Sequence, residues 1–444
     1  MAAEVRMMKT PAELALAETF AAARGTLPGD GDIAARRADA FARFAAAGLP
    51  HRRIEAWHYT DLRALMREAL PVAGAPDAAG LEKAKVAGAM LAEVDARRLY
   101  LVNGTFAPEI SDLADLEPGL SITGLAAALG AGDPLVTAHL GRTVAADDAI
   151  LALNTALMGD GVVIHVAAGV ELARPLLLVS ITTQETPSAV FSRSLMVVEE
   201  GASARLVEIH EGPGGDVAYQ VNTALELVVG PRANLDRVKI ACEGAGVLHV
   251  GSVLAKVADH AKVALSAFNL SGGMVRNQLM MQITGAYTEA HISGVSLLNA
   301  RQQADTMLAL DHIAPHCESR ENFRAVLDGS SRDVFQGRIA VRREAQKTDA
   351  RMLARALLLS ENAESDNKPE LEIFADDVQC GHGCTTGTLD EQLRFYLMSR
   401  GIPAREAEAL LIQAFVGEVT DAVADDGVRE ALIEATRNWL LTRE

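Results

Sequence analysis

The chain has 444 residues, of which 49% are hydrophobic but only 4% aromatic, and its formal net charge is −18. This length allows two or three domains with a sizeable core, which must be aliphatic because aromatic residues are so scarce. The acidic balance argues against nucleic acids and anionic membrane surfaces, whose binding depends on Lys and Arg.

Cysteine content and the N-terminal residues indicate the compartment. Four cysteines in so long a chain give no disulfide framework, which fits a reducing environment. The first twenty residues, MAAEVRMMKTPAELALAETF, lack the uninterrupted apolar stretch of a signal peptide. No run of 18 apolar residues predicts a membrane span. We therefore expect a soluble, cytoplasmic protein.

Residues 1–95 are rich in alanine and are predicted to form an N-terminal helical domain. Thr10 and Glu13 have the spacing of a capping box, and Pro11 stands where the first helical turn would begin. A second helix is expected over residues 33–47, where Ala and Phe recur at near-helical spacing.

The stretch Trp57-His58-Tyr59 brings large aromatic residues together in a chain that has few of them. Such a cluster suits packing better than catalysis, so we interpret Trp57 as an anchor that ties helices together. His58 is expected at the surface or behind a site rather than as a metal ligand.

The pattern changes near Arg97, where a predicted β-rich core begins that extends over residues 96–385. Leu99-Tyr-Leu-Val102 followed by Asn103-Gly104 indicates a strand and a turn. A mixed stretch with short helices continues to about residue 157. From there to residue 360 the pattern is strand after strand, with almost no helical period.

Within this core a repeat opens successive strands. Ala202, Ala233, Ala261 and Ala290 each follow a turn, at spacings of 31, 28 and 29 residues. Self-similarity without intervening helices predicts a solenoid whose stacked coils share one aliphatic core. A parallel β-helix fits best. The alternative is a β-sandwich, whose hairpins should show more Asn-Gly and Asp-Gly pairs than this sequence has.

Residues 386–444 return to a helical period and are predicted to form a C-terminal helical domain. Thr388 and Glu391 have capping-box spacing, Gly401 is a stop signal, and Pro403 begins the next helix. Two amphipathic helices follow. We expect this domain to close the end of the solenoid, as terminal units must to keep a stack soluble.

The candidate site is Cys380-Gly-His382-Gly-Cys384, which follows an apolar strand. If the strand continues, these three side chains point from one face. Thiolates and imidazole suit zinc, copper or iron–sulfur chemistry. Three ligands leave a site incomplete, which implies an open position or a ligand from another chain. The alternative is a tight turn at the glycines, with both cysteines packed as small hydrophobes.

Other chemistry is not indicated. The sequence has no GxxxxGK[ST] phosphate loop and no GxSxG, HExxH or GxGxxG motif. Asp376 and Asp377 are adjacent, so on a strand they would point to opposite faces. His312, His316 and Cys317 surround a proline that disfavours a helical metal motif, so we interpret these histidines as structural. We expect no catalytic residues.

Several segments resemble the SufD family, one type of subunit of the SufBCD iron–sulfur cluster assembly complex. Gly383 stands where the related SufB proteins usually carry Glu, and no cysteine precedes Cys242; both features favour SufD over SufB. Cys384 departs from the family, which mostly has Ala there. The matching segments are EAWHYTD (residues 55–61), HIAPHCESRENFRAVLDGSSRDVFQGRI (312–339), DDVQCGHG (376–383) and FYLMSRGI (395–402).

The resemblance implies a right-handed parallel β-helix flanked by helical domains, acting as a non-catalytic scaffold. It implies pairing with a SufB-like subunit through the β-helix and docking of a SufC-like ABC ATPase on the C-terminal helices. His382 would hold iron or a nascent cluster at the SufB interface, and Cys380 would present a thiol there. A reduced flavin has been linked to such complexes. The ATPase would face Phe395, Tyr396, Arg400 and Gly401.

Two other classes of function remain open from the sequence. A β-helix enzyme acting on polysaccharide would need a cleft of carboxylates and basic residues, and most such enzymes are secreted. A self-associating structural protein is the other alternative, because an exposed strand edge can pair with a copy of itself and give a homodimer.

Overall fold

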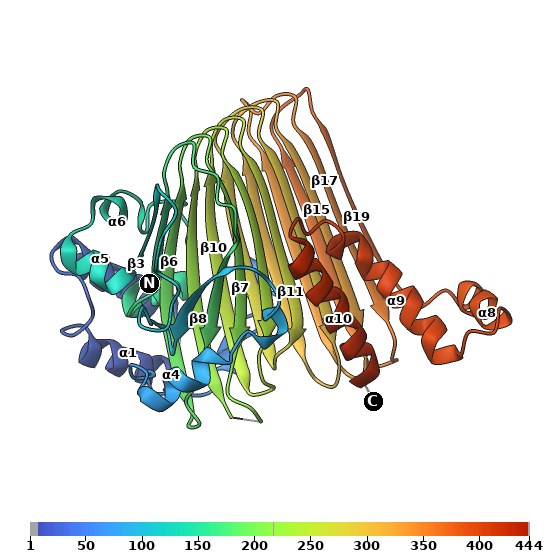
Figure 1. The fold of residues 1–444 in the computed structure, drawn as a ribbon, viewed down its shortest axis with the longest axis horizontal. Helices are drawn as coiled ribbons and strands as arrows, with labels where there is room; N and C mark the ends of the chain where they lie inside the picture. The colour runs from blue at the N-terminus through green and yellow to red at the C-terminus, as the bar shows by residue number, and fades with distance from the viewer. Residues whose placement is uncertain (1–7, 216, 443–444) are drawn as a thin grey trace, which may run out of the picture.

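A computed structural model describes residues 8–215 and 217–442. Its helices lie before, beside and after a large β region (Figure 1). They are α1 (Pro11–Ala23), α2 (Asp32–Ala47), η1 (Glu55–Trp57), α3 (Leu62–Leu65), α4 (Ala78–Lys85), η2 (Ala89–Leu91), α5 (Leu125–Ala131), α6 (Pro134–His139), α7 (Ala149–Leu157), α8 (Glu391–Ser399), α9 (Ala404–Thr420) and α10 (Asp426–Thr442).

The strands begin at Arg97, as the sequence predicts, and continue to Gly387. They are β1 (Arg97–Val102), β2 (Thr105–Phe106), β3 (Leu120–Gly124), β4 (Val162–Val166), β5 (Leu176–Ile181), β6 (Ser188–Val198), β7 (Ser203–Glu211), β8 (Tyr219–Val229), β9 (Asn234–Cys242), β10 (Val247–Val257), β11 (Lys262–Ser271), β12 (Met274–Ile283), β13 (Glu289–Leu298), β14 (Gln303–His312), β15 (Glu318–Leu327), β16 (Arg332–Val341), β17 (Asp349–Leu358), β18 (Glu364–Ile373) and β19 (Gln379–Gly387).

Successive strands alternate between two sheets. Over the described residues, the odd-numbered strands from β5 to β19 join β1 and β2 in a ten-stranded sheet, and the even-numbered strands from β4 to β18 join β3 in a nine-stranded sheet. From β4 onward every pairing within a sheet is parallel. Each coil therefore adds one strand to each sheet, and the expected parallel β-helix core with flanking helices is confirmed (Figure 1).

The repeat corresponds to one column of backbone hydrogen bonds. The residue that follows each repeat residue donates its backbone amide to the carbonyl oxygen of the repeat residue in the previous coil. These hydrogen bonds connect Ala202, Ala233 and Ala261 in order. The next member of this column is Thr288 and not Ala290, because Glu289 N donates to Ala261 O. The expected fourth repeat residue, Ala290, is thus displaced from this column by two residues. The displacement keeps the same strand face, and all of these side chains are buried.

The helices α1, α2 and α7 cover the outer face of the nine-stranded sheet, whereas α4 and η2 pack against β1 and β5 of the ten-stranded sheet. The predicted capping box is confirmed, since Glu13 N donates to Thr10 Oγ1 and Thr10 N donates to the Glu13 carboxylate. α1, α2 and α7 pack with Phe191 and Val250 in one apolar cluster. Trp57 is buried in the same cluster, which confirms its interpretation as an anchor, and His58 is exposed.

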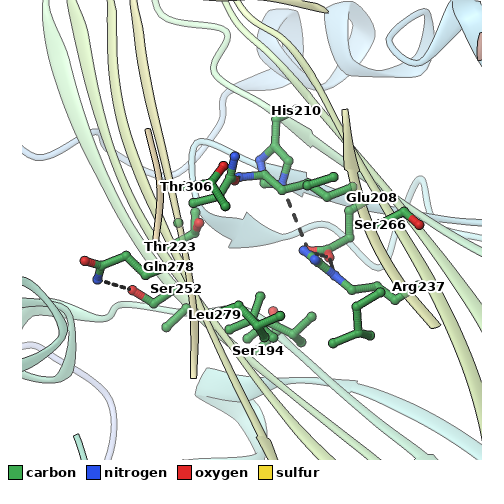
Figure 2. A pocket seen from close by; sticks show the side chains of 18 of the residues that line it. Ser194, Glu208, His210, Thr223, Arg237, Ser252, Ser266, Gln278, Leu279 and Thr306 are labelled. Carbon is green, nitrogen blue, oxygen red and sulfur yellow. Dashed lines mark hydrogen bonds and ion pairs between the residues drawn. The ribbon is translucent and has the colours of Figure 1, made fainter. Parts of the chain in front are cut away.

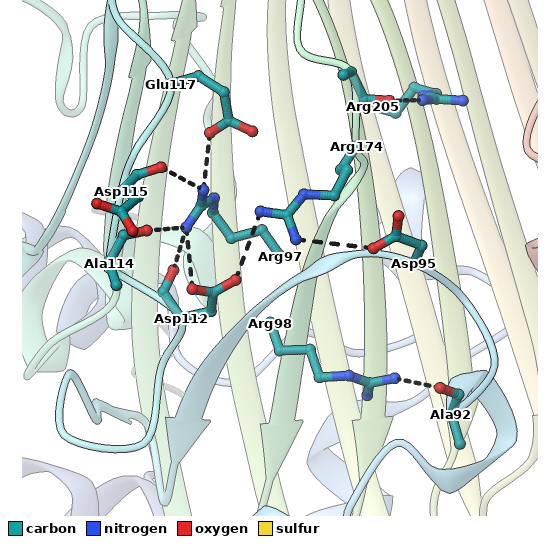
Figure 3. A network of polar contacts seen from close by, with 11 residues as sticks. Ala92, Asp95, Arg97, Arg98, Asp112, Ala114, Asp115, Glu117, Arg174 and Arg205 are labelled. Atoms are coloured by element: carbon teal, nitrogen blue, oxygen red, sulfur yellow. Dashed lines mark hydrogen bonds and ion pairs between the residues drawn. The ribbon is translucent and has the colours of Figure 1, made fainter.

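A buried arginine fixes the entry into the solenoid. Arg97, the first residue of β1, donates to the carbonyl oxygens of Asp112, Ala114 and Asp115, and forms ion pairs with the carboxylates of Asp112 and Glu117 (Figure 3). These contacts hold the loop after β2 against the first coil, because a buried guanidinium needs its donors satisfied.

The C-terminal helices do not close the solenoid end, so that expectation is wrong. α9 and α10 lie across the outer face of the ten-stranded sheet, against β11, β13 and β15 (Figure 1). Ile412, Val416 and Leu432 pack there with Val295 and Val326 of the sheet. The helices follow this apolar outer face because it is where their own apolar sides can be buried. The last coil, β18 and β19, is left uncovered by them.

The start of α8 also differs from the prediction. Its N-cap is Asp390 and not Thr388, because the Asp390 carboxylate accepts from the backbone amides of both Gln392 and Leu393. Gly401 follows the helix with a φ of 89°, as a C-terminal stop requires. None of the helices in the described part of the chain is long and apolar enough to cross a membrane.

Candidate functional site

The candidate ligands lie on the last strand of the ten-stranded sheet, at the open end of the solenoid. β19 runs parallel to β17, and the three β17 residues beside the candidate ligands are buried in the solenoid core. Because neighbouring residues in a sheet share a face, the candidate ligands project from the interior face of the last coil. The neighbours are Ala350 with Cys380, Met352 with His382, and Ala354 with Cys384.

These three residues differ in burial. His382 is exposed, whereas Cys380 and Cys384 are half-buried and contact the edge of the core. Burial raises the pKa of both thiols, so in the single chain they are held in the protonated form. The strand continues through both glycines, so the predicted shared face is observed and the alternative of a tight turn is not.

The single chain does not assemble a complete metal site here. Cys384 lies four positions after Cys380 on an extended strand, which puts their Cα atoms about 13 Å apart, too far for both thiols to bind one ion. Across residues 8–215 and 217–442, no group of three or more His, Cys, Asp or Glu side chains is placed to hold a metal ion. Metal binding by His382 and Cys380 therefore stays a prediction that requires a second chain.

A buried acid lies behind the candidate ligands, and sequence reasoning missed it. Glu321 of β15 is beside Met352, which is beside His382, so the three form one interior column. Both carboxylate oxygens of Glu321 are buried without a hydrogen-bond partner among the described residues. Burial raises the pKa of this carboxyl to about 8, and its charge contributes to the raised pKa of Cys380.

The two edge strands of the open end differ in composition. β18 carries Lys368 and Pro369 at its centre, and charge and proline on an edge strand discourage pairing with another chain. β19 has neither a charged residue nor a proline. A Cβ added to Gly381 would meet nothing within 4 Å, so packing within the chain does not require glycine there. β19 is therefore the edge suited to pair with another strand.

α8 presents the other candidate surface. This helix has no buried residue and projects beyond the solenoid, at the far end from the N-terminal helices (Figure 1). Phe395 is 72% exposed and Tyr396 is 54% exposed. Arg400 donates to the Tyr396 hydroxyl at 3.1 Å, and its guanidinium lies over the Tyr396 ring. An apolar helix face left in solvent is typical of a protein interaction site.

The low aromatic content predicts an aliphatic interior, but the interior of the solenoid is not aliphatic throughout. Midway along the solenoid, a belt of charged and polar side chains surrounds a cavity of about 60 Å³ between the two sheets (Figure 2). Arg237 forms an ion pair with Glu208, and Lys239 donates to Asn277 Oδ1 at 2.7 Å. Burial lowers the pKa of Lys239 to about 8. In the sequence, these polar residues alternate with apolar ones, as they also would on a strand whose polar side faces solvent. The sequence pattern therefore does not reveal that the polar side faces the interior.

The other histidines singled out in the sequence have structural contacts. His316 lies in a turn with a φ of 57° and stacks on Tyr287, with ring centroids 4.7 Å apart. His312 ends β14, is buried, and its Nε2 lies 3.0 Å from Ser319 Oγ. Cys317 is buried and Cys242 is half-buried. These positions support the interpretation that they stabilise the coils.

Comparison with known proteins identifies the class. Residues 180–415 match the family model "SUF system FeS cluster assembly, SufBD core domain", and residues 29–178 match the model of the SufBD protein N-terminal region. The first match alone covers more than half of the chain. The chain belongs to the SufBD family of iron–sulfur cluster assembly proteins.

Within that family the chain is SufD-like. It is 30% identical over 389 residues to the iron–sulfur cluster assembly protein SufD of Escherichia coli, covering 87% of this chain and 88% of the relative. It is also 30% identical over 385 residues to a SufBD family protein of Synechocystis, with 84% of each chain covered. The SufD of Bacillus subtilis is 26% identical over 285 residues, which cover 64% of this chain and 65% of the relative.

Proposed function

We propose that this protein is a non-catalytic scaffold subunit for iron–sulfur cluster assembly, which pairs with a SufB-like subunit through the open end of its solenoid. The observation that carries the proposal is the uncovered last coil. It presents Cys380 and His382 on β19, an edge strand that has no charged residue or proline to prevent pairing. Pairing along β19 would continue the ten-stranded sheet into the partner. The partner would then supply the ligands that this chain lacks.

The chemistry expected at this junction is the holding of iron or of a nascent cluster as cargo. A thiolate and an imidazole are soft donors suited to iron–sulfur chemistry. His382 is exposed and needs no rearrangement to reach a ligand from another chain. The raised pKa of Cys380 means that its thiol ionises when a metal arrives, not before. Ligands split between two chains also allow the cargo to leave when the chains move apart.

The site assignment predicts a loss of iron in His382→Ala. When this variant is coexpressed with SufB-like and SufC-like subunits, the isolated complex is expected to contain at least several-fold less iron and acid-labile sulfide than wild type. The amount of complex should be unchanged, because the exposed side chain does not support the fold. Iron, sulfide and subunit ratios measure the two effects separately.

Thr386→Ala is the matched control for that experiment. Thr386 lies four residues further along the same face of β19, is also exposed, and has no soft donor. Iron content in this variant should equal that of wild type. Unchanged iron loading and cluster transfer in His382→Ala would refute the role of His382, whereas loss of the SufB-like subunit from both variants would instead assign this face to subunit contact alone.

We further propose that α8 docks a SufC-like ABC ATPase through Phe395, Tyr396, Arg400 and Gly401. Replacing Phe395 and Tyr396 together with alanine is expected to weaken copurification of the ATPase at least tenfold, because exposed aromatic residues dominate such interfaces. Val86→Ala is the control, since Val86 is 75% exposed but lies near α4 at the other end of the chain. Equal ATPase recovery with the double variant would rule out this surface.

A further inference from the structure

The polar belt inside the solenoid contains a buried lysine that contacts no counter-charge. Lys239 of β9 lines the cavity of about 60 Å³ and is only 4% exposed. Its ammonium donates to Asn277 Oδ1 at 2.7 Å and lies 3.5 Å from His249 Nε2. With a pKa of about 8, the amine is still protonated at neutral pH. A buried ammonium ordinarily has an ionic partner, and here both printed neighbours are uncharged side chains.

The two carboxylates nearest to Lys239 are engaged elsewhere. Glu208 forms an ion pair with Arg237 (Figure 2). Glu243 lies behind His249, with its carboxyl group 2.5 Å from His249 Nδ1, and is not part of the cavity wall. Burial raises the pKa of Glu243 and lowers the pKa of His249 well below its usual value, so both groups are favoured in their neutral forms. Among the described residues, the wall thus carries two cations and one carboxylate, an excess of one positive charge.

The cavity has polar walls and leaves space beside this ammonium. A Cβ added to Gly251 would stand 2.8 Å from Lys239 Nζ and 3.3 Å from Thr223 Oγ1, so glycine keeps that space open. Figure 2 shows Thr223 and Thr306 across the cavity from Arg237. A cavity of this volume has room for a few water-sized particles, and its polar wall gives them hydrogen-bond partners. The cavity therefore suits a small polar occupant.

We propose that this cavity binds one monovalent anion of about the size of chloride, held by the ammonium of Lys239 and the hydroxyl of Thr223. One such anion neutralises the excess charge of the wall, whereas a dianion would leave a buried negative charge without a partner. Hydrogen bonds from a charged donor to an anion are also stronger than those between neutral groups. The site lies midway along the solenoid and does not depend on the proposed function.

Anomalous diffraction tests the occupant directly. Crystals of the wild-type chain soaked in sodium bromide should show an anomalous peak inside the cavity, within hydrogen-bonding distance of Lys239 Nζ. Lys239→Met retains a long side chain without the charge and should lose this peak. Lys262→Met is the matched control, since Lys262 is exposed on β11, and it should keep the peak. Water without bromide in the wild-type cavity, or an equal peak in Lys239→Met, would overturn the proposal.

Thermal unfolding tests the same site in solution, because an anion that binds only the folded chain raises the Tm by mass action. Replacing sodium gluconate with sodium chloride at constant ionic strength should raise the wild-type Tm saturably, by at least about 1 °C. Gluconate is too large for the cavity. Lys239→Met should show no such rise, and Lys262→Met should behave as wild type.

Equal wild-type Tm values in the two salts, or the same chloride-dependent rise in Lys239→Met, would refute the anion site. Circular dichroism checks that each variant is folded. If Lys239→Met does not fold, the bromide experiment on the wild-type chain still decides between an anion and water alone.

Discussion

Replacing Asp305 with alanine is expected to destabilise the protein by about 3–5 kcal/mol, because it leaves a buried guanidinium without its counter-charge. Asp305 and Arg276 form an ion pair in which both side chains are fully buried. The same guanidinium donates to Ala56 O at 2.6 Å and lies 3.9 Å from the centre of the Trp57 ring. The pair thus fastens the segment around Trp57 to strands β12 and β14. Urea unfolding monitored by circular dichroism measures the loss.

Two further variants identify the cause. Removing both charges in an Arg276→Met, Asp305→Leu double variant should cost less than Asp305→Ala alone, because no buried charge is then unpaired. Glu289→Ala breaks the exposed ion pair with Lys262 and should cost under about 1 kcal/mol. Equal effects of Asp305→Ala and Glu289→Ala would show that burial does not determine the strength of the contact.

Replacing Glu321 with leucine is expected to have the opposite effect on the free energy of unfolding and to stabilise the protein at neutral pH. Burial raises the pKa of Glu321 in the folded protein to about 8, above its ordinary value of 4.5, so the folded state holds its proton more tightly than the unfolded chain. Between pH 4.5 and about pH 8, the contribution of Glu321 to the free energy of unfolding falls by about 1.4 kcal/mol for each pH unit. The contribution of this group is fully present below the unfolded pKa and is lost as pH rises through the folded pKa. At pH 7 the loss amounts to roughly 3 kcal/mol.

This prediction is checked by comparing wild type and Glu321→Leu at two pH values. The gain in unfolding free energy should be larger at pH 7.5 than at pH 5.5, by roughly 2–3 kcal/mol. Glu318→Leu is the control, since Glu318 is exposed and begins the same strand on its opposite face. A gain that does not change with pH would mean that Glu321 ionises in the folded protein as it does in the unfolded chain.

The coils could be predicted because their signal is local and repeated. Small residues recur at Ala202, Ala233 and Ala261 because each opens a strand at the same corner, where the backbone of the next coil donates to its carbonyl. The sequence repeat does not identify Thr288 as the next member of the column, because threonine stands there in place of alanine. Its hydroxyl donates to Ala258 O and Gly285 O. A column defined by backbone pairing does not need the same side chain in every coil.

The placement of the helices could not be predicted. The amphipathic pattern of α9 and α10 shows that each has an apolar side, but not which surface covers it. The outer face of the ten-stranded sheet carries Val295 and Val326, whose period-two pattern does not distinguish the outside of the solenoid from its inside. Only the assembled coils show that this outer face is apolar and that the solenoid end stays open.

The sequence by itself determined the family, the stacked β-helix, the anchoring tryptophan and the strand face that carries Cys380 and His382. These depend on local periodicity and on residue types at fixed spacing. The tertiary structure decided that this face lies at an uncovered end, that Glu321 is buried behind it without a partner, and that charges occupy the middle of the interior. The physical reason is that burial is a property of what stacks on a strand, and a strand's own residues do not specify its neighbours.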